Sequence, residues 1–308
     1  MKAQCVCPSQ KIAIIGAGAV GSTTAYTIML RNLASEVILI DINTQKEIGE
    51  VMDIDEGLCF VETGCVRAGD YHSASDADII IITAGLAQKP GETRMDLVNK
   101  NREIIKSIFK SIGKIKSTTI VMMVSNPVDI MTHVAQEVSG LPLNQVFGTG
   151  TALDTARLHT DIGHKLGIYA QNVDGYVMGE HGNSEFIAWS TVSVGGVAVK
   201  DLGISTKEEE ILEGIVRNAA YEIINRKGAT FYGIAVTVAD IVEAILFNQH
   251  KILPLSVRVE NYLGVSDICI GVPAVLGRNG IEKVWPLELT SEEKKKFQKS
   301  AKIIKEHL

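Results

Sequence analysis

A glycine-rich turn near the N-terminus constrains the fold of this chain more than any other feature. The apolar run Lys11–Ile15 has the length and the branched side chains of a buried strand. Gly16-Ala17-Gly18-Ala19-Val20-Gly21 follows it directly, and a segment of helical length, Gly21–Asn32, comes next. Gly16 permits a tight turn, and Gly21 lets helix and strand pack closely. The sequence therefore predicts a strand, a tight turn and a helix in this order.

This context makes a common glycine pattern specific for dinucleotide binding. Gly18 would let a pyrophosphate approach the backbone, and the helix N-terminus that begins around Ala19 and Val20 would stabilise its charge. Asp41 closes a second apolar run, 20 residues beyond Gly21. There it would accept hydrogen bonds from ribose hydroxyls and repel a 2′-phosphate, which favours NAD over NADP. The alternative is a glycine-rich turn without a ligand, and the flanking segments argue against it.

Apolar runs along the first half of the chain predict an α/β fold. Short segments rich in β-branched residues alternate with segments of helical length, as in a parallel sheet that is buried on both faces. After the strand Lys11–Ile15 and the helix Gly21–Asn32, the expected strands are Glu36–Ile40, Asp78–Thr83 and Thr119–Val124. The further expected helices are Thr93–Ser111 and Asp129–Ser139. The pattern predicts a Rossmann-type doubly wound parallel sheet.

The second half has a different pattern, which predicts an α+β domain. Ser205-Thr206-Lys207-Glu208 is typical of a capping box and opens a long helix that ends at Gly228. Two neighbouring apolar rows follow this helix: Ile211, Ile215, Ala219 and Ile223, beside Leu212, Val216, Ala220 and Ile224. Further strands are expected at Leu255–Glu260 and Asp267–Gly271, and a terminal helix at 291–306. We expect a flexible arm over 1–10, an NAD-binding domain over 11–148 and a catalytic domain over 149–308.

Two motifs in the second half supply proton chemistry. Gly179-Glu180-His181-Gly182 places a histidine just past an apolar run, and Asp154 and Arg157 are spaced to share one face of a helix. They offer a base, a carboxylate to orient it and a guanidinium group that can grip a carboxylate substrate. A structural histidine and an intrahelical ion pair worth a few tenths of a kcal/mol are the alternative. It leaves the coincidence of the two motifs unexplained.

Further motifs resemble those of the NAD-dependent L-lactate and malate dehydrogenase family. The resemblance covers nearly the whole chain after Gln10, in the right order and spacing. Besides the glycine and histidine motifs, it rests on Thr83-Ala84-Gly85, on the run 88–94, on Ser125-Asn126-Pro127 and on the run 148–157.

The resemblance implies a role for each residue of the site. His181 would be the acid/base that exchanges a proton with the substrate hydroxyl, and Asp154 would hold its ring. Arg157 would bind the substrate carboxylate, and Arg94 would polarise the ketone from a loop that closes over the substrate. Other residues implied to contact substrate or cofactor are Asn126, Thr230, Thr83, Ala84 and Gly85.

Position 88 bears on the choice of substrate. In this family, malate enzymes tend to carry arginine there, which pairs with the second carboxylate of oxaloacetate, whereas lactate enzymes carry glutamine. This chain has Gln88, so a second carboxylate would lack a partner. Pyruvate and L-lactate are therefore the expected substrates, in glycolysis and fermentation. Malate or another L-2-hydroxy acid is the alternative, because the neighbouring Lys89 could reach an acidic substrate.

The family also bears on regulation and assembly. Many bacterial members are activated by fructose 1,6-bisphosphate through an arginine and a histidine at positions that hold His159 and Asp174 here. Aspartate would repel phosphate, so we expect no such activation. The family usually forms dimers or tetramers, and we expect a homotetramer.

Composition restricts the partners. The net charge of −6 and the pI near 5.7 disfavour nucleic acid and anionic membranes as partners. No apolar run approaches the roughly 18 residues that a membrane span needs. Five cysteines without a paired framework indicate a reduced, cytoplasmic protein, and no metal site is expected, although Cys5 and Cys7 have an unassigned role.

Two other functions remain open from the sequence. An NAD-dependent glycosidase would need a metal site with cysteine and histidine ligands, and no such cluster is evident. A catalytically silent NAD-binding module would be expected to have lost His181, Arg157 or Asp154, and the sequence retains all three.

Overall fold

The computed structural model describes residues 10–62, 64–86 and 94–308, and the side chain of Arg94 is not part of this description. Gln88, Lys89, Cys5, Cys7 and most of the arm expected over 1–10 lie outside the described residues.

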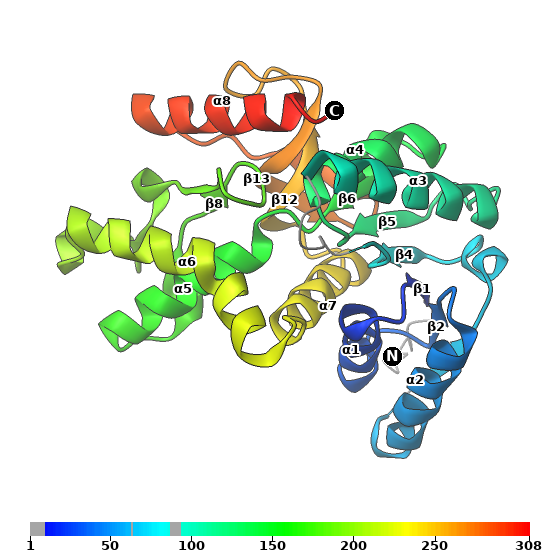
Figure 1. The fold of residues 1–308 in the computed structure, drawn as a ribbon. Helices are drawn as coiled ribbons and strands as arrows, with labels where there is room; N and C mark the ends of the chain where they lie inside the picture. Colours follow the sequence, from blue (N-terminus) through cyan, green and yellow to red (C-terminus); the bar gives the residue numbers. More distant parts are fainter. Residues whose placement is uncertain (1–9, 63, 87–93) are drawn as a thin grey trace, which may run out of the picture.

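A nine-stranded sheet forms the centre of the molecule (Figure 1). Its strand order is β14-β13-β12-β6-β5-β4-β1-β2-β3. The six strands from β6 to β3 run parallel, in the order 3-2-1-4-5-6 read from that edge, which is the dinucleotide-binding arrangement. These are β1 Lys11–Ile15, β2 Glu36–Ile40, β3 Cys65–Ala68, β4 Ile79–Ile82, β5 Ile120–Met123 and β6 Val146–Gly148. The expected doubly wound sheet is confirmed.

Three antiparallel strands extend the same sheet beyond β6. They are β12 Lys251–Val259, β13 Ile268–Gly277 and β14 Gly280–Val284. β12 joins through the pair Ser256 and Gly148, so the second half of the chain continues the sheet of the first. Shorter strands form two small separate sheets: β7 Val173–Asp174 with β10 Ser193–Val194 and β11 Val197–Ala198, and β8 Val177–Met178 with β9 Phe186–Ile187.

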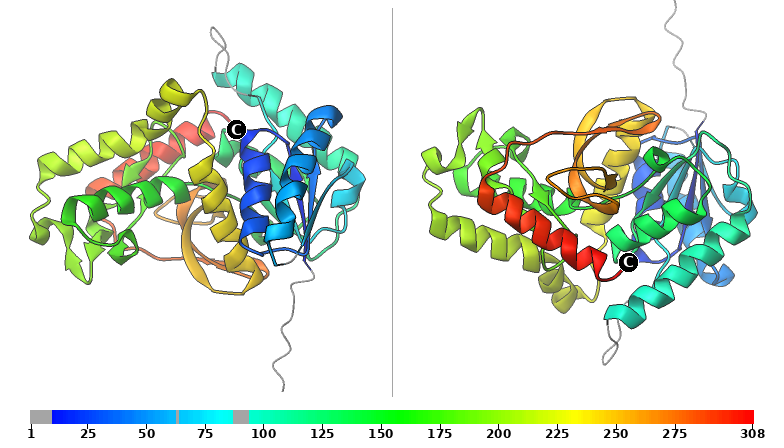
Figure 2. Two further views of the ribbon diagram at one scale, coloured as in Figure 1. Left: turned by 90° about the horizontal axis from the view of Figure 1, so that it is seen from below. Right: turned by 90° about the horizontal axis from the view of Figure 1, so that it is seen from above.

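Helices cover both faces of the large sheet (Figure 2). α1 and α2 are seen in front from below, with α7 packed against α1, and α3, α4 and α8 are in front from above. The helices are α1 Ala19–Leu30, α2 Thr44–Gly57, α3 Arg94–Ile112, α4 Val128–Val138, α5 Ala152–Leu166, α6 Thr206–Lys227, α7 Tyr232–Leu246 and α8 Ser291–Lys305. Among the helices described, none is long and apolar enough to cross a membrane.

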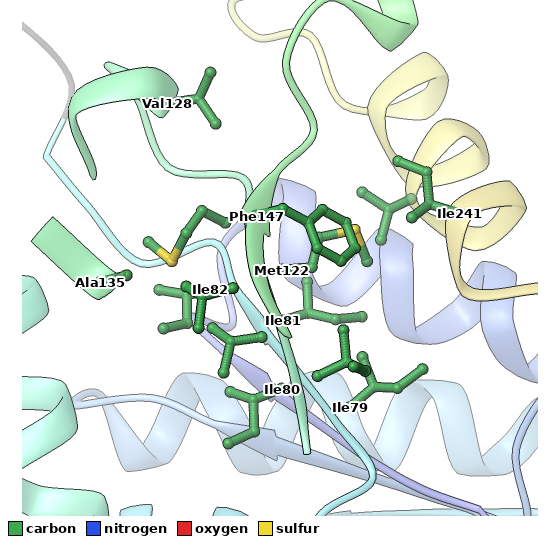
Figure 3. Close-up of a cluster of buried hydrophobic side chains, with 14 of the residues drawn as sticks. Ile79, Ile80, Ile81, Ile82, Met122, Val128, Ala135, Phe147 and Ile241 are labelled. Carbon is green, nitrogen blue, oxygen red and sulfur yellow. The ribbon is translucent and has the colours of Figure 1, made fainter. Parts of the chain in front are cut away.

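The centre of the sheet is apolar on both faces, as a doubly covered parallel sheet requires. All four residues of β4 are isoleucines, and each is buried. Figure 3 shows Val128 and Ala135 of α4 on one side of this strand and Ile241 of α7 on the other. An uninterrupted apolar run is thus explained by burial on two sides.

The turn after β1 has the geometry that its glycines predict. Gly16 has a φ of 111°, in the left-handed region. A Cβ atom built on Gly21 would lie 1.8 Å from the carbonyl oxygen of Gly16, so only glycine fits at this contact between turn and helix. This close approach holds the N-terminus of α1 over the carboxyl end of β1.

α6 has the capping box that the sequence predicts, but its two apolar rows are buried only in part. The capping box of Ser205 and Glu208 is present, and Gly228 ends the helix in the left-handed conformation. The two apolar rows do not form a buried face, however. Only Leu212 and Val216 are buried, in a core shared with α5, whereas Ile211, Ile215 and Ile224 are exposed. The helix packs through a narrow stripe, so half of its second row and all of its first row contribute little to this core.

Candidate active site

A cavity of about 320 Å³ brings together residues from five parts of the chain, one of which is α3 with Leu97. α5 contributes Asp154 and Arg157, and the segment between β8 and β9 contributes His181 and Glu185. Asn126 and Pro127 lie at the N-terminus of α4, and α6 closes the cavity with residues that include Arg217, Tyr221 and Ile224.

His181, Asp154 and Arg157 form one hydrogen-bonded group. His181 Nδ1 lies 2.8 Å from Asp154 Oδ2, and Arg157 Nη1 donates to Asp154 Oδ1 at 2.7 Å. Asp154 is 1% exposed, whereas the His181 side chain is 29% exposed. The buried carboxylate therefore fixes both partners, and the imidazole presents its other nitrogen, Nε2, to the cavity.

The backbone around His181 is held on two sides. Gly179 has a φ of 99° and exchanges two backbone hydrogen bonds with Gly271 of β13. The backbone N–H of His181 donates to Asp129 Oδ2 at 2.9 Å, and Asp129 Oδ1 accepts from the Ser256 hydroxyl at 2.6 Å. This fixed backbone sets the direction of the histidine ring. The sequence reasoning missed Asp129, although its place two residues after Pro127 was a signal.

Electrostatics favour a charged histidine beside a charged aspartate. Burial alone lowers the pKa of His181, but the Asp154 carboxylate beside Nδ1 outweighs it and raises that pKa to about 9. Burial likewise raises the pKa of Asp154, but His181 and Arg157 together leave it below its usual value. The pair is therefore able to keep a proton on the imidazole at neutral pH.

Glu185 is a second carboxyl group close to His181, and the sequence reasoning did not identify it. Its side chain is 6% exposed, and Oε2 lies 4.0 Å from His181 Nδ1. Burial raises its pKa first and Asp154 raises it further, to about 8. The spacing of four residues from His181 was the available signal, but Glu185 lies outside any regular helix, where that spacing has no fixed meaning.

Asn126 lies at the edge of the cavity, before α4. Its backbone carbonyl accepts a hydrogen bond of 2.8 Å from Nδ2 of Asn101, which is 1% exposed on α3. Asn101 also accepts from the backbone N–H of Leu86 at 2.8 Å, so it ties the segment after β4 to the segment after β5. Sequence reasoning had no reason to select this asparagine from the middle of a helix.

A second cavity, of about 330 Å³, lies at the carboxyl ends of the parallel strands. Gly16, Gly18 and Asp41 line it from β1 and β2, and Thr83, Ala84 and Gly85 line it after β4. This is where the strand order reverses and where nucleotides bind in such sheets. Ala19, Val20 and Gly21 lie alongside in the first turn of α1.

The residues of this second cavity fit a dinucleotide. Among the described residues, no atom comes within 4 Å of a Cβ built on Gly18, so the backbone there is open to a phosphate group. Asp41 Oδ2 accepts from the Ala17 N–H at 2.6 Å, and Oδ1 accepts from the Asn43 N–H at 2.8 Å. These bonds fix the carboxylate at the mouth of the cavity, with acceptor capacity left for ribose hydroxyls.

Three residues selected from the sequence are not placed in the site. Gln88 lies outside the described residues, and the side chain of Arg94 is likewise not described, although its backbone begins α3. Thr230 is half-buried between α6 and α7, and it is not among the described residues that line the cavity around His181.

Comparisons with known proteins match both halves of the chain to domains of one family. Residues 10–148 match the model of the lactate/malate dehydrogenase NAD binding domain, and residues 151–308 match that of the lactate/malate dehydrogenase alpha/beta C-terminal domain. An L-lactate dehydrogenase of Clostridium botulinum (strain Loch Maree / Type A3) is 45% identical over 305 residues, which cover 97% of this chain and 96% of that protein. An L-lactate dehydrogenase of Acetivibrio thermocellus is 45% identical over 303 residues, 96% of each chain.

Two solved structures have the same fold. A lactate dehydrogenase from a Medee basin deep-sea metagenome library superposes with a TM-score of 0.94 at 40% identity, over 98% of each chain. The minor L-lactate dehydrogenase of Enterococcus mundtii, in a ligand-bound form, superposes with a TM-score of 0.92 at 40% identity, over 97% of each chain.

Proposed function

Since this chain belongs to the lactate/malate dehydrogenase family, we propose that it is an L-lactate dehydrogenase, which transfers a hydride reversibly between L-lactate and NAD⁺. The observation that carries the assignment of its chemistry is the buried Asp154 carboxylate, which binds both His181 and Arg157 in one cavity. An acid/base and a carboxylate-binding group are thereby held side by side.

NAD(H) supplies the hydride, and the turn after β1 is the part of the chain that holds it. Gly18 leaves the backbone open to the pyrophosphate, and the N-terminus of α1 stabilises its charge. Asp41 binds the ribose hydroxyls. Because a carboxylate there would repel a 2′-phosphate, the non-phosphorylated cofactor is preferred.

His181 moves the proton. Its Nδ1 is engaged by Asp154, so Nε2 donates to the ketone oxygen when pyruvate is reduced and accepts from the hydroxyl when lactate is oxidised. Asp154 keeps the ring in this orientation and stabilises the imidazolium. Pyruvate reduction therefore requires protonated His181, and lactate oxidation requires the neutral ring.

Arg157 orients the substrate. One of its guanidinium nitrogens is committed to Asp154, and its other donors are available to the substrate carboxylate. From the family resemblance we assign Arg94 to the ketone oxygen, Asn126 to the carbonyl and nicotinamide region, and Thr230 to the substrate pocket. Gln88 is assigned to the methyl end of pyruvate.

Several finer properties belong to the same proposal. We expect a homotetramer that works in the cytoplasm and is not activated by fructose 1,6-bisphosphate. His159 supports the last point, because its Nε2 lies 3.0 Å from the Gly175 carbonyl and burial lowers its pKa, so a neutral ring faces Asp174.

The experiment that tests the substrate is the loss of NADH absorbance with a panel of 2-oxo acids. We expect a far higher kcat/KM for pyruvate than for oxaloacetate, and the Gln88→Arg variant should shift this ratio toward oxaloacetate by about 10²-fold or more, or about 2.7 kcal/mol. If the wild type preferred oxaloacetate, the malate assignment would replace this one. No turnover with any acid would favour a silent NAD-binding module.

A further inference from the structure

Glu185 lines both the cavity around His181 and a third cavity, of about 290 Å³, which also borders α8. The nearest oxygen and nitrogen atoms of Glu185, Asp154 and His181 lie within 4.8 Å of one another. His181 Nδ1 is thus flanked by two carboxyl groups, one at hydrogen-bond distance and one at 4.0 Å. The mechanism above uses only the first.

A carboxyl group in this position is costly to ionise. It is 6% exposed and lies close to the negative charge of Asp154, and both effects favour its neutral form. The charges of His181 and Arg157 oppose them, and so does Arg217 on α6. Arg217 Nη2 lies 3.5 Å from the backbone carbonyl of Glu185, and its Nε is buried without a hydrogen-bond partner among the described atoms. The titratable groups that line these two cavities together with Glu185 are Asp154 and Arg157 of α5, Glu213, Arg217 and Tyr221 of α6, Lys296 and Lys299 of α8, and Glu180 and His181 of its own segment.

The balance of these groups sets the state of Glu185. Its pKa is raised to about 8 and that of His181 to about 9. Below the first value Glu185 holds a proton and adds no negative charge next to Asp154. Above it the carboxylate forms while His181 is still protonated, and the new charge then opposes loss of the histidine proton.

We propose that Glu185 is a second carboxyl partner of the catalytic histidine: held buried 4.0 Å from His181 Nδ1, it stabilises the protonated ring for pyruvate reduction. This inference rests on the proposed lactate dehydrogenase function. Glu185 acts through His181, so it is a positioning residue. In its neutral form it also adds no charge that would compete with the substrate carboxylate for Arg157.

Removing the Glu185 carboxylate should lower the pKa of His181. Only protonated His181 can donate to pyruvate, so kcat/KM falls as the pH rises through the histidine pKa. Glu185→Gln removes a charge that raises this pKa, so the alkaline limb should move to lower pH. An opposite charge at this distance shifts a pKa by about 1–3 units, and partial exposure of His181 favours the low end. We expect a shift of about 1 unit, or about tenfold in kcat/KM at pH 9.5. Near pH 6, where Glu185 is neutral, we expect less than about a twofold difference.

Two variants separate this effect from a structural one. Glu185→Asp retains a carboxylate and should leave the alkaline limb between those of the wild type and Glu185→Gln. Glu222→Gln removes the same charge from the exposed face of α6, where Glu222 pairs with Arg226, and should leave the limb in place. A structural defect in Glu185→Gln would lower activity equally at all pH values and would overturn the inference.

A titration of the histidine ring tests the coupling without turnover. The His181 signal is identified as the ring resonance that His181→Asn removes from the NMR spectrum. In the wild type, without substrate, it should titrate in two steps, with the earlier one near pH 8, and in Glu185→Gln in one step at lower pH. Even if the variant did not fold, the wild-type titration would decide, because a single step overturns the inference. Failure of the proposed function would differ: the two steps would be present, but no pyruvate would be reduced at any pH.

Discussion

Asp154→Asn should affect both roles of the buried carboxylate, which orients the His181 ring and raises the pKa of that ring. Both of its oxygens accept, one from His181 Nδ1 at 2.8 Å and one from Arg157 Nη1 at 2.7 Å. An asparagine amide has one acceptor oxygen, so one of the two donors would face an N–H₂ group. Leaving a buried donor unsatisfied costs about 1–3 kcal/mol. The group that holds the histidine in its reactive orientation would thereby be weakened.

The same substitution removes the main cause of the raised histidine pKa. That pKa would fall from about 9 to near or below its usual value of 6.5, because burial would then dominate over the remaining carboxylates. A fall of about 2.5 units corresponds to about 3.4 kcal/mol. At pH 7.5 roughly one tenth of His181 or less would remain protonated. Protonation alone then lowers kcat/KM for pyruvate about tenfold, and misorientation of the ring adds to this loss.

The assay is the pH profile of kcat/KM in both directions. Pyruvate reduction should fall by about 10²-fold or more at pH 7.5, and its alkaline limb should move down by about 2.5 units. Lactate oxidation uses the neutral ring and should lose less at the same pH. A variant within about threefold of the wild type, with an unmoved limb, would refute the reasoning that Asp154 sets the state of His181.

Three further predictions follow from the described geometry. Gly21→Ala would place a Cβ 1.8 Å from the Gly16 carbonyl, so the free energy of unfolding should drop by about 2 kcal/mol and the melting temperature by roughly 5 °C, and a change within 1 °C would contradict this contact. Asp41→Ser with a nearby added arginine should shift the ratio of kcat/KM values for NADH and NADPH by at least about tenfold toward NADPH, and equal use of both by the wild type would show that the carboxylate does not face the ribose. Fructose 1,6-bisphosphate should leave the apparent KM for pyruvate unchanged because of His159 and Asp174, and a large decrease would overturn that expectation.

The parallel part of the sheet could be predicted from the sequence because its strands are buried on both faces. An all-isoleucine run such as β4 shows neither the periodicity of an amphipathic helix nor the alternation of a strand with one exposed face. The edge strand β3 was missed, since Cys65 is exposed and Arg67 interrupts the apolar run. β6 has only three residues, and its pairing with Ser256 is a long-range contact that no local pattern carries.

The hydrogen-bonded group of His181, Asp154 and Arg157 could be predicted in part. Asp154 and Arg157 lie three residues apart near the start of α5, so their spacing alone places them together. His181 is brought to them by tertiary packing, through the contacts of Gly179 with Gly271 and of the His181 N–H with Asp129. Local sequence cannot specify such contacts. For the same reason Glu185 and Asn101 became visible only in the folded chain.

The burial of α6 could not be predicted from its apolar rows, for a physical reason. Hydrophobic periodicity shows which face of a helix is apolar, but it does not show how much of that face a neighbour covers. In this chain only the stripe of Leu212 and Val216 is buried. Ala220 and Ile224 of the same row line the cavity around His181.

The measurement that tests the central claim most directly is turnover of His181→Asn with pyruvate, together with its dissociation constant for NADH. The histidine acts in proton transfer, whereas the turn after β1 holds the cofactor. The substitution does not alter this turn. We predict that NADH binding stays within about threefold of the wild type while kcat/KM for pyruvate falls by about 10³-fold or more, or about 4 kcal/mol. Turnover within tenfold of the wild type would remove His181 from the mechanism and contradict the account.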